Sequence, residues 1–122
     1  MILGVGIDIV EVADLEQRLE REIILNAFSA GEQEYADSLP LQRSEILAGR
    51  WAAKEAFGKA LGSGLRTEWP LNEIEVAHDA MGRPVILLSA RMARVLPFKA
   101  KVHCSISHSR AYATACVVIE QG

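Results

Sequence analysis

The stretch Arg50–Gly62, RWAAKEAFGKALG, combines one carboxylate with three cations at helical spacing. In a helix, Glu55 and Lys59 lie one turn apart on one face, and Arg50 and Lys54 lie one turn apart on an adjacent stripe. Such a set suits a phosphate bridged by a metal ion, because the carboxylate can hold the ion while the cations neutralise phosphoryl oxygens. The alternative is a solvated helix face with ordinary ion pairs, each worth about 0.2–0.5 kcal/mol.

The N-terminal segment MILGVGIDIVE alternates in the manner of a β-strand. One face is apolar and the other carries two glycines and an acid: Leu3, Val5, Ile7 and Ile9 against Gly4, Gly6 and Asp8. Glycines inside a strand usually mark close approach by a ligand, a bulge or another backbone. Asp8 lies at the end of this cleared face, where it can hold a cation. Alternatively, it caps a turn or pairs with a nearby base.

Further polar side chains gather near the C-terminus. Apolar and polar residues alternate over 102–107, and a polar turn then leads into a strand of small residues. This pattern predicts a β-hairpin with a cationic tip. Taken alone, His108 and Arg110 are interpreted as turn residues, and Ser105 and Ser107 as solvent-facing side chains.

The two cysteines predict neither a disulfide nor a metal site. A hairpin that turns at Ser109 would place Cys104 opposite Thr114 and Cys116 opposite Val102. The thiols would then be diagonal neighbours with Cα atoms roughly 7–8 Å apart, too far for an unstrained disulfide. The sequence has no Cys-x-x-Cys pair and its histidines are scattered, so a structural zinc site has no support.

Size and charge limit the possible functions. A chain of 122 residues is expected to form one domain over 1–122. Half of its residues are hydrophobic, which suggests that some apolar surface is buried between subunits. A formal net charge of −3 gives no reason to expect nucleic-acid binding. No run approaches about 18 consecutive apolar residues, the length that a membrane-spanning helix needs. At the N-terminus, no positively charged region precedes a short apolar region of the kind found in signal peptides. We therefore expect no membrane span, no secretory signal and a cytoplasmic location.

The remaining residues predict an α+β fold, a small antiparallel sheet with helices on one side. Asp14 can cap a helix running to about Phe28, with Leu15, Leu19, Ile23 and Ala27 near helical spacing. Ser29 and Glu32 form a capping box for a short helix that stops before Pro40.

A long third helix and a strand pair are expected to follow. Ser44 can cap this helix, and Gly62 suits the position just after its end. Strands are predicted over 73–78 and 85–88 around a turn at Met81–Arg83, and then a short helix over 90–96.

Together these segments resemble a known family, the holo-acyl-carrier-protein synthases, which are the short, stand-alone type of 4′-phosphopantetheinyl transferase. The order and spacing of the motifs match from one terminus to the other, although 63–92 matches only in outline. The matching motifs are Gly6–Glu11 (GIDIVE), Phe28-Ser29 with Glu32, Leu47–Phe57 (LAGRWAAKEAF) with Lys59, and Ser105–His108 (SISH).

The resemblance implies an enzyme of fatty-acid biosynthesis that transfers the phosphopantetheine arm of coenzyme A to a serine of apo acyl carrier protein, releasing adenosine 3′,5′-bisphosphate. Asp8 and Glu55 would hold one Mg²⁺, for which Mn²⁺ can substitute, and Lys59 would act with them on the pyrophosphate. Other positions match coenzyme A contacts of the family: Arg50, Lys54, Lys59, Gly82, Arg83, Pro84, Ser107 and His108.

The resemblance also implies a homotrimer with active sites at subunit interfaces. The last strand is small or apolar on both faces, which suits a strand buried on both sides. Family members usually meet their acidic carriers with basic residues on the helix after the first strand. Here that helix offers only Arg18 and Arg21, which we expect to dock the carrier. Alternatively, they pair with Asp14 or Glu22.

Two other functional classes stay open at this point. One is a different magnesium-dependent phosphoryl enzyme, such as a hydrolase of nucleotide pyrophosphates, which would need no carrier-docking face. The other is a non-catalytic trimeric binder of coenzyme A, which would tolerate loss of Asp8 and Glu55. The general base is also open, because Glu55 could take the serine proton directly or through a metal-bound water.

Overall fold

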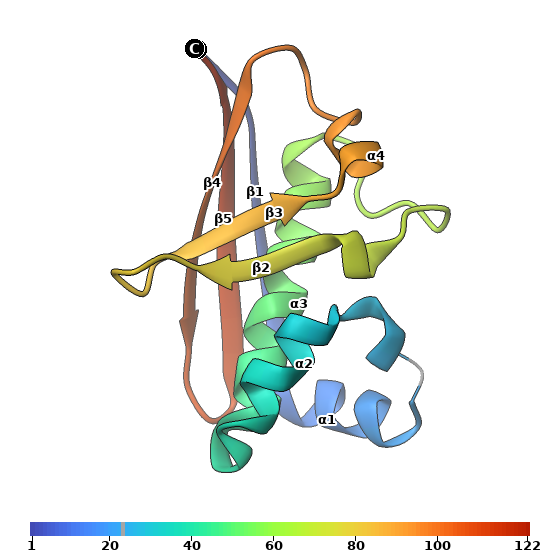
Figure 1. The fold of residues 1–122 in the computed structure, drawn as a ribbon. Coiled ribbons are helices and arrows are strands. Elements are labelled where there is room, and N and C mark those ends of the chain that lie inside the picture. Colours follow the sequence, from blue (N-terminus) through green and yellow to red (C-terminus); the bar gives the residue numbers. More distant parts are fainter. Residues whose placement is uncertain (23) are drawn as a thin grey trace.

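The computed structural model describes residues 1–22 and 24–122. Its larger sheet has three antiparallel strands in the order β1-β5-β4, namely β1 (Ile2–Glu11), β4 (Ala100–His108) and β5 (Tyr112–Gln121). The first and last strands of the chain are therefore neighbours, and β5 lies between the two edge strands. Helix α3 (Arg43–Ala60) packs along one face of this sheet (Figure 1).

The contact between β1 and α3 brings two backbones together. A Cβ atom added at Gly4 would lie 1.8 Å from the carbonyl oxygen of Ala60, and one at Gly6 would lie 1.9 Å from that of Ala56. Close approach of another backbone therefore explains both glycines, and the pairing of β1 with β5 is also irregular between Ile2 and Gly4. The facing side of α3 is lined by alanines, which permits this short distance between helix and sheet.

A second, two-stranded sheet crosses α3 at about its mid-height (Figure 1). It pairs β2 (Ile74–His78) with β3 (Pro84–Leu88), as the sequence predicted. Gly82 has a φ of 83° in the connecting turn, which explains the glycine there. The following helix, α4 (Ala90–Ala93), is capped by Ser89 and is shorter than expected.

Two short helices lie near the start of α3 (Figure 1). The capping box of α2 (Ala30–Asp37) is confirmed, because the Ser29 hydroxyl accepts from the Glu32 N–H and the Glu32 carboxylate accepts from the Ser29 N–H. The first helix is shorter than predicted. It spans Val12–Glu20 (α1) and is followed by a separate 3₁₀ turn, Leu25–Ala27 (η1).

The helix starts also differ from the prediction. Asp14 lies in the first turn of α1 rather than at its N-cap, which is Glu11, and neither helix α1 nor α3 has a side-chain cap. Ser44 lies inside α3, whose N-cap is Gln42. The chain enters both helices directly from ordered structure, a strand and a 3₁₀ turn, so sequence capping signals were weak guides. Ile23, predicted to lie on the first helix, falls outside the described residues.

The register of the C-terminal hairpin differs from the expected one. Cys104 lies opposite Val117, and Cys116 lies opposite Ser105. The thiols therefore point to opposite faces of the sheet, and both cysteines are free, as expected. The turn spans three residues rather than centring on Ser109, which shifts every pair. Burial raises the pKa of Cys104 to about 11, so its thiol stays protonated at neutral pH.

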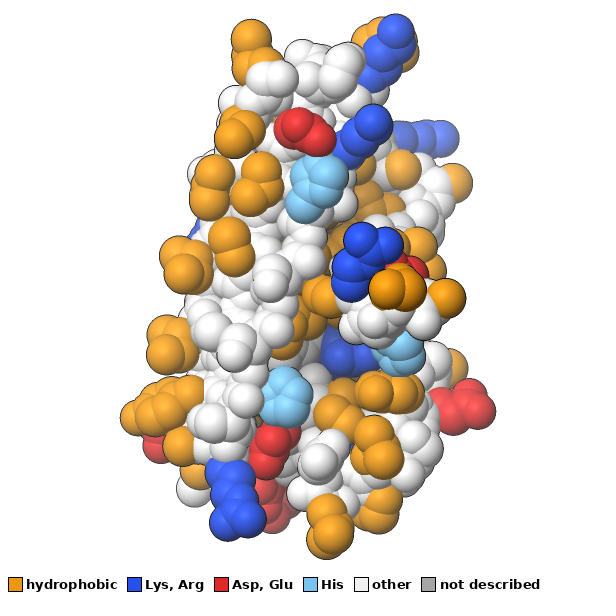
Figure 2. Space-filling model, turned by 90° about the vertical axis from the view of Figure 1, so that its left-hand side faces the viewer, with side chains coloured by type: hydrophobic (Ala, Val, Ile, Leu, Met, Phe, Trp, Pro, Cys, Tyr) orange, Lys and Arg blue, Asp and Glu red, His pale blue; other side chains and the backbone are white. Residues whose placement is uncertain are grey.

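The sheet face that turns away from α3 exposes apolar side chains. Ile7 and Ile9 of β1 are 65% and 67% exposed, whereas alternate residues of β5 on the α3 side are buried. Figure 2 shows hydrophobic side chains gathered in a column down one margin of that view. None of the described helices is long and apolar enough to cross a membrane.

The β1–α3 contact leads to a first prediction. Replacing Gly6 with Ala would push a methyl group into the Ala56 carbonyl, and overpacking of this kind costs about 1–3 kcal/mol of unfolding free energy. We expect a lower midpoint in thermal unfolding followed by circular dichroism. An unchanged midpoint would show that β1 can move away from α3 without cost.

Candidate active site

A first cleft of about 410 Å³ lies where β1, α1 and α3 meet. Its walls bring together the three residues that the sequence singled out as catalytic, and we call it the carboxylate cleft. It is lined by Asp8, Ile9, Val10, Glu11, Asp14, Leu15, Arg18, Trp51, Glu55 and Lys59. Asp8 reaches the cleft because the glycine face of β1 is the face that meets α3.

The charged side chains of this cleft lie close together. Lys59 Nζ donates to Asp8 Oδ1 at 3.0 Å and to the carbonyl oxygen of Ile7 at 3.0 Å. Burial raises the pKa of Glu55, and the nearby Asp8 carboxylate raises it further, while Lys59 and Arg18 oppose the shift. Two carboxylates thus repel one another beside a single strongly held lysine. A bound cation would relieve that repulsion.

The donor set of the carboxylate cleft fits magnesium better than zinc or calcium. Asp8 and Glu55 offer only oxygen ligands, and the described residues contain no cluster of three or more histidine, cysteine or acidic side chains arranged to hold a metal. Mg²⁺ is commonly held by one or two carboxylates, with phosphate oxygens and waters completing its octahedron.

A second cleft of about 350 Å³ lies between the edge strand β4, the start of α3 and the β2–β3 hairpin. We call it the arginine cleft. Figure 2 looks onto this side of the molecule, where histidine and basic side chains border a hollow. Its lining residues are Tyr35, Gln42, Ile46, Gly49, Arg50, Ala77, His78, Gly82, Pro84, Ile106 and His108.

Arg50 is held at the centre of the arginine cleft by aromatic neighbours. Its guanidinium carbon lies 5.0 Å from the centroid of the Tyr35 ring, and Nη2 lies 3.5 Å from Nδ1 of His78. Its Nε is the one buried side-chain nitrogen or oxygen of the described residues that lacks a hydrogen-bond partner. Burial lowers the pKa of Arg50, and the Glu32 carboxylate opposes the shift. A ligand acceptor could satisfy this donor.

Several of the predicted coenzyme A contacts converge in the arginine cleft, but others do not. Arg50, Gly82, Pro84 and His108 line it, and His108 Nδ1 lies 3.1 Å from Glu45 Oε2. The other predicted residues lie elsewhere: Lys59 in the carboxylate cleft, Arg83 exposed with its Nε 2.9 Å from Asp79 Oδ2, and Ser107 on the sheet face away from α3.

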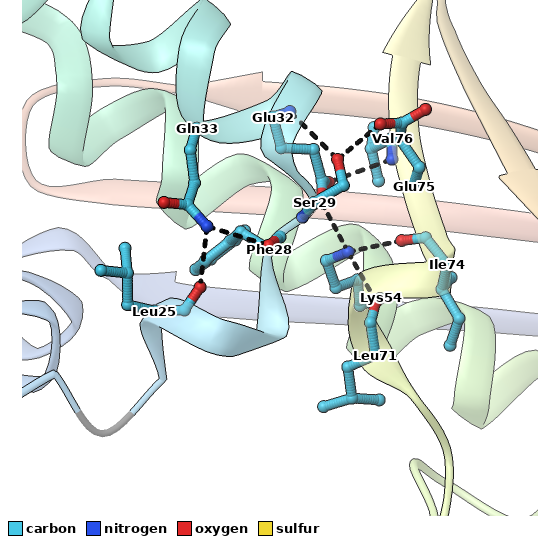
Figure 3. A network of polar contacts seen from close by, with 10 residues as sticks. All are labelled: Leu25, Phe28, Ser29, Glu32, Gln33, Lys54, Leu71, Ile74, Glu75 and Val76. Carbon is cyan, nitrogen blue, oxygen red and sulfur yellow. Dashed lines mark hydrogen bonds and ion pairs between the residues drawn. The ribbon is translucent and has the colours of Figure 1, made fainter.

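Lys54 corrects one of these expectations. Its side chain is fully buried, and Nζ donates to Glu32 Oε1 at 2.8 Å, to the Leu71 carbonyl at 2.9 Å and to the Ile74 carbonyl (Figure 3). An ammonium group has three protons, and all three are committed inside the protein. Burial lowers the pKa of Lys54, while the Glu32 carboxylate opposes the shift. Lys54 is therefore not available to a ligand in either cleft.

Two residues of the arginine cleft escaped the sequence analysis. Tyr35 packs its ring edge-on against His78, with centroids 4.6 Å apart, and both contact Arg50. They come from α2 and β2, which are separated by more than thirty residues of chain. No local pattern marks such a pair, and the only sequence signal was an aromatic side chain on an otherwise polar short helix.

The two candidate docking arginines differ in their surroundings. Arg18 is exposed on α1, with its guanidinium carbon 5.2 Å from the centroid of the Trp51 ring, and it borders the carboxylate cleft. Arg21 is the exposed C-cap of the same helix and lies one turn further from the cleft. Neither arginine forms an ion pair among the described residues, so the predicted alternative of pairing with Asp14 or Glu22 finds no support.

The two clefts open on opposite sides of α3. Successive residues of an α-helix are rotated by about 100°, so Arg50 and Glu55 project in nearly opposed sectors. Residues of the edge strand β1 line the carboxylate cleft, and residues of the other edge strand, β4, line the arginine cleft. One chain therefore carries two separate clefts, one beside each edge strand of its sheet.

An α+β fold with a carboxylate–lysine cleft suits a protein that acts on phosphorylated substrates. Residues 4–117 match the family model described as the 4′-phosphopantetheinyl transferase superfamily. The chain therefore belongs to this superfamily.

Relatives across bacteria carry one consistent name. The holo-[acyl-carrier-protein] synthase of Treponema denticola is 45% identical over 123 residues, covering 98% of this chain and 99% of the relative. The enzyme of the same name from Bacillus velezensis is 42% identical over 124 residues, covering 99% and 98% of the two chains.

Solved structures agree with this assignment. A holo-(acyl-carrier-protein) synthase from Bacillus anthracis in complex with CoA (3′,5′-ADP) superposes with a TM-score of 0.84 at 37% identity, covering 100% of this chain and 99% of that one. The ACPS–CoA complex of Chronobacterium ammoniagenes gives a TM-score of 0.89 at 32% identity, covering 98% and 97%. The expected α+β transferase fold is confirmed.

The raised pKa of Glu55 leads to a second prediction. When the pKa of a carboxyl group is higher in the folded chain than in the unfolded chain, the folded protein loses stability as pH rises from the unfolded-state pKa to the folded-state pKa. Glu55 is such a group. Glu55→Gln should therefore melt at a higher temperature than the wild type at pH 7.5 in metal-free buffer. The difference should vanish below the ordinary glutamate pKa of about 4.3. Differential scanning calorimetry across pH checks both, and a variant that melts lower at pH 7.5 contradicts the proposed repulsion.

Proposed function

We propose that this protein transfers the 4′-phosphopantetheine arm of coenzyme A to a serine hydroxyl of an apo acyl carrier protein, with adenosine 3′,5′-bisphosphate as the second product. The main observation behind this proposal is that Asp8, Glu55 and Lys59 line one cleft in a chain of this superfamily. The names of the relatives and the coenzyme A complexes of two similar structures support the same substrates.

We propose that Asp8 and Glu55 hold one Mg²⁺, with Mn²⁺ as a possible substitute. When bound, such an ion supplies positive charge to the pyrophosphate and polarises the phosphorus that the serine attacks. Lys59 then exchanges part of its bond to Asp8 for a phosphoryl oxygen and stabilises charge that develops on the leaving phosphate. Removing a preorganised contact of this kind typically costs about 2.7–4 kcal/mol of transition-state stabilisation.

Two routes remain for the proton of the attacking serine. Glu55 would accept it directly or through a water held beside its carboxylate, so that the proton ends on Glu55 by either route. A carboxylate that binds Mg²⁺ is a weaker base than a free one. Burial and the neighbouring Asp8 raise the pKa of Glu55 in the absence of metal, and metal binding would lower it again.

The arginine cleft is proposed to take the nucleotide half of coenzyme A. Arg50 offers an unpartnered Nε, His108 and the Gly82–Pro84 turn border the same hollow, and Arg83 can swing toward it from its pairing with Asp79. Tyr35 and His78 complete the wall. Coenzyme A must then reach from this cleft to a carboxylate cleft.

A shared active site in a homotrimer resolves the separation of the two half-sites. Within one chain, the clefts lie on opposite sides of α3, at opposite edges of the sheet. A cyclic assembly can set the β4 edge of one copy beside the β1 edge of the next, which joins one half-site from each. The exposed apolar residues of β1 give such an assembly a surface to bury, and Ser107 lies on the same sheet face.

The third prediction tests the metal site. Asp8→Ala or Glu55→Ala removes one of only two protein ligands, so we expect turnover to fall by about 10²–10³-fold or more while the fold survives. The assay incubates protein, coenzyme A, Mg²⁺ and apo carrier, and mass spectrometry measures the mass added to the carrier. Full activity of Glu55→Ala at ordinary Mg²⁺ would rule out the site. A protein that releases nucleotide without loading the carrier would instead be a hydrolase.

The fourth prediction tests site sharing by complementation. Arg50→Ala and Glu55→Ala are each expected to be nearly inactive alone. When the two variants are unfolded and refolded together at equal amounts, about one quarter of shared sites should receive both native residues, and about that fraction of wild-type activity should return. One variant is isotope-labelled, so that native mass spectrometry of the refolded sample identifies trimers of mixed composition. Continued inactivity in trimers of mixed composition would place each complete site within one chain.

The fifth prediction concerns carrier docking by Arg18 and Arg21. Helix α1 forms one wall of the carboxylate cleft, so a carrier whose serine enters this cleft would lie beside it. Arg21→Glu should raise KM for an acidic carrier and leave KM for coenzyme A unchanged, and added salt should weaken the wild-type interaction. Arg94→Glu, at an exposed residue after α4 that lines neither cleft, is the matched charge-reversal control and should leave the carrier KM unchanged. Unchanged carrier KM in both Arg21→Glu and high salt would move docking elsewhere.

A further inference from the structure

Three of the elements that line the arginine cleft meet at one buried ion pair. Lys54 lies on α3 one turn after Arg50, and Glu32 lies on α2 one turn before Tyr35. The third element is β2, which carries His78 at its end. Figure 3 shows Lys54 and Glu32 pointing toward one another between these elements.

Every polar atom of the pair has a partner. Glu32 Oε1 accepts from Lys54 Nζ at 2.8 Å and from the Ser29 N–H at 2.8 Å, and Oε2 accepts from the Val76 N–H at 3.0 Å. The remaining protons of Lys54 go to the carbonyls of Leu71 and Ile74. Both side chains are fully buried. The pair thus bonds α2, α3 and both ends of the segment that enters β2.

Such a pair is poorly explained as a source of stability. Desolvating two charges offsets most of their attraction, and apolar residues of similar volume often replace a buried ion pair without loss. What apolar residues do not supply is direction, because hydrogen bonds fix both the distance and the angle between the elements they join. Here the fixed elements carry Tyr35, Arg50 and His78, whose mutual contacts are 4.6–5.0 Å ring and cation distances that small shifts would disrupt.

We propose that Glu32 and Lys54 are positioning residues that set the spacing of Tyr35, Arg50 and His78, and so determine affinity for the nucleotide half of coenzyme A. This inference rests on the proposed function of the arginine cleft. Both side chains are fully buried, and neither is among the residues that line the arginine cleft. The carboxylate cleft takes none of its lining from α2 or β2, so its chemistry and carrier docking are independent of the pair.

The first experiment neutralises the pair without opening a large cavity. In Lys54→Met/Glu32→Gln, both charges are gone and one carbonyl oxygen remains for the Ser29 or Val76 N–H. We expect a folded trimer in which the Kd for adenosine 3′,5′-bisphosphate, measured by calorimetry, and KM for coenzyme A rise roughly tenfold or more. KM for the carrier should change less than about twofold. Each single variant should melt below the double variant, because it leaves one buried charge unpaired.

A second comparison uses single substitutions that disturb the protein less, and it can be made even if the double variant does not fold. Ser29 and Ser89 are both helix N-caps whose hydroxyls accept from a backbone N–H, but only Ser29 belongs to the network, where its hydroxyl also donates to Glu75. Ser29→Ala and Ser89→Ala should lower the melting temperature by similar amounts. Only Ser29→Ala should weaken binding of adenosine 3′,5′-bisphosphate.

The outcomes separate this inference from the proposed function. Wild-type nucleotide affinity in the double variant, or equal loss of affinity in Ser29→Ala and Ser89→Ala, overturns the positioning role. A parallel rise of KM for carrier and coenzyme A overturns it as well, because that pattern indicates general loosening. If the wild type binds the nucleotide but never loads a carrier, the proposed reaction fails while the binding comparison still decides the role of the pair. A wild type that does not bind the nucleotide overturns both.

Discussion

The structure depends on the contact between the backbone of β1 and the backbone of α3. With glycine at positions 4 and 6, the carbonyls of Ala56 and Ala60 come within a distance that no Cβ could share. This contact orients β1 so that its glycine face, and with it Asp8, meets the helix. Asp8 is then brought against Glu55 and Lys59, which lie on the same side of α3. The same orientation leaves the apolar face of β1, with Val5, Ile7 and Ile9, exposed in the single chain.

Helix α3 contributes to both clefts, and its two sides carry different chemistry. One side presents Glu55 and Lys59 to a cleft where burial and the neighbouring Asp8 carboxylate raise the pKa of Glu55. The other presents Arg50, held over Tyr35 with one nitrogen left without a partner. Lys54 points into the interior of the protein, where its ammonium group donates hydrogen bonds to three acceptors. Adjacent cations of one motif thus serve a ligand cleft and the interior, according to the direction in which each side chain leaves the helix.

Much of the architecture could be predicted because its causes are local. The capping box at Ser29 and Glu32, the glycine turn at Gly82 and the alternation of the edge strands each act within a few residues. The grouping of Asp8, Glu55 and Lys59 also followed from the sequence, through its resemblance to a family. The predicted length of α1 and the predicted register of the C-terminal hairpin were wrong. A helix end and a strand register are set by the parts of the protein that the chain packs against.

The sequence by itself determined the residue types, the helical spacing of Glu55 and Lys59, and the cleared glycine face beside Asp8. Only the tertiary structure decided that Lys54 is buried, that Tyr35 and His78 flank Arg50, and that the two clefts lie on opposite edges of one sheet. The physical reason is the range of the forces involved. Backbone periodicity and capping act between near neighbours, whereas desolvation and pairing of a side chain depend on elements that folding brings together from distant parts of the chain.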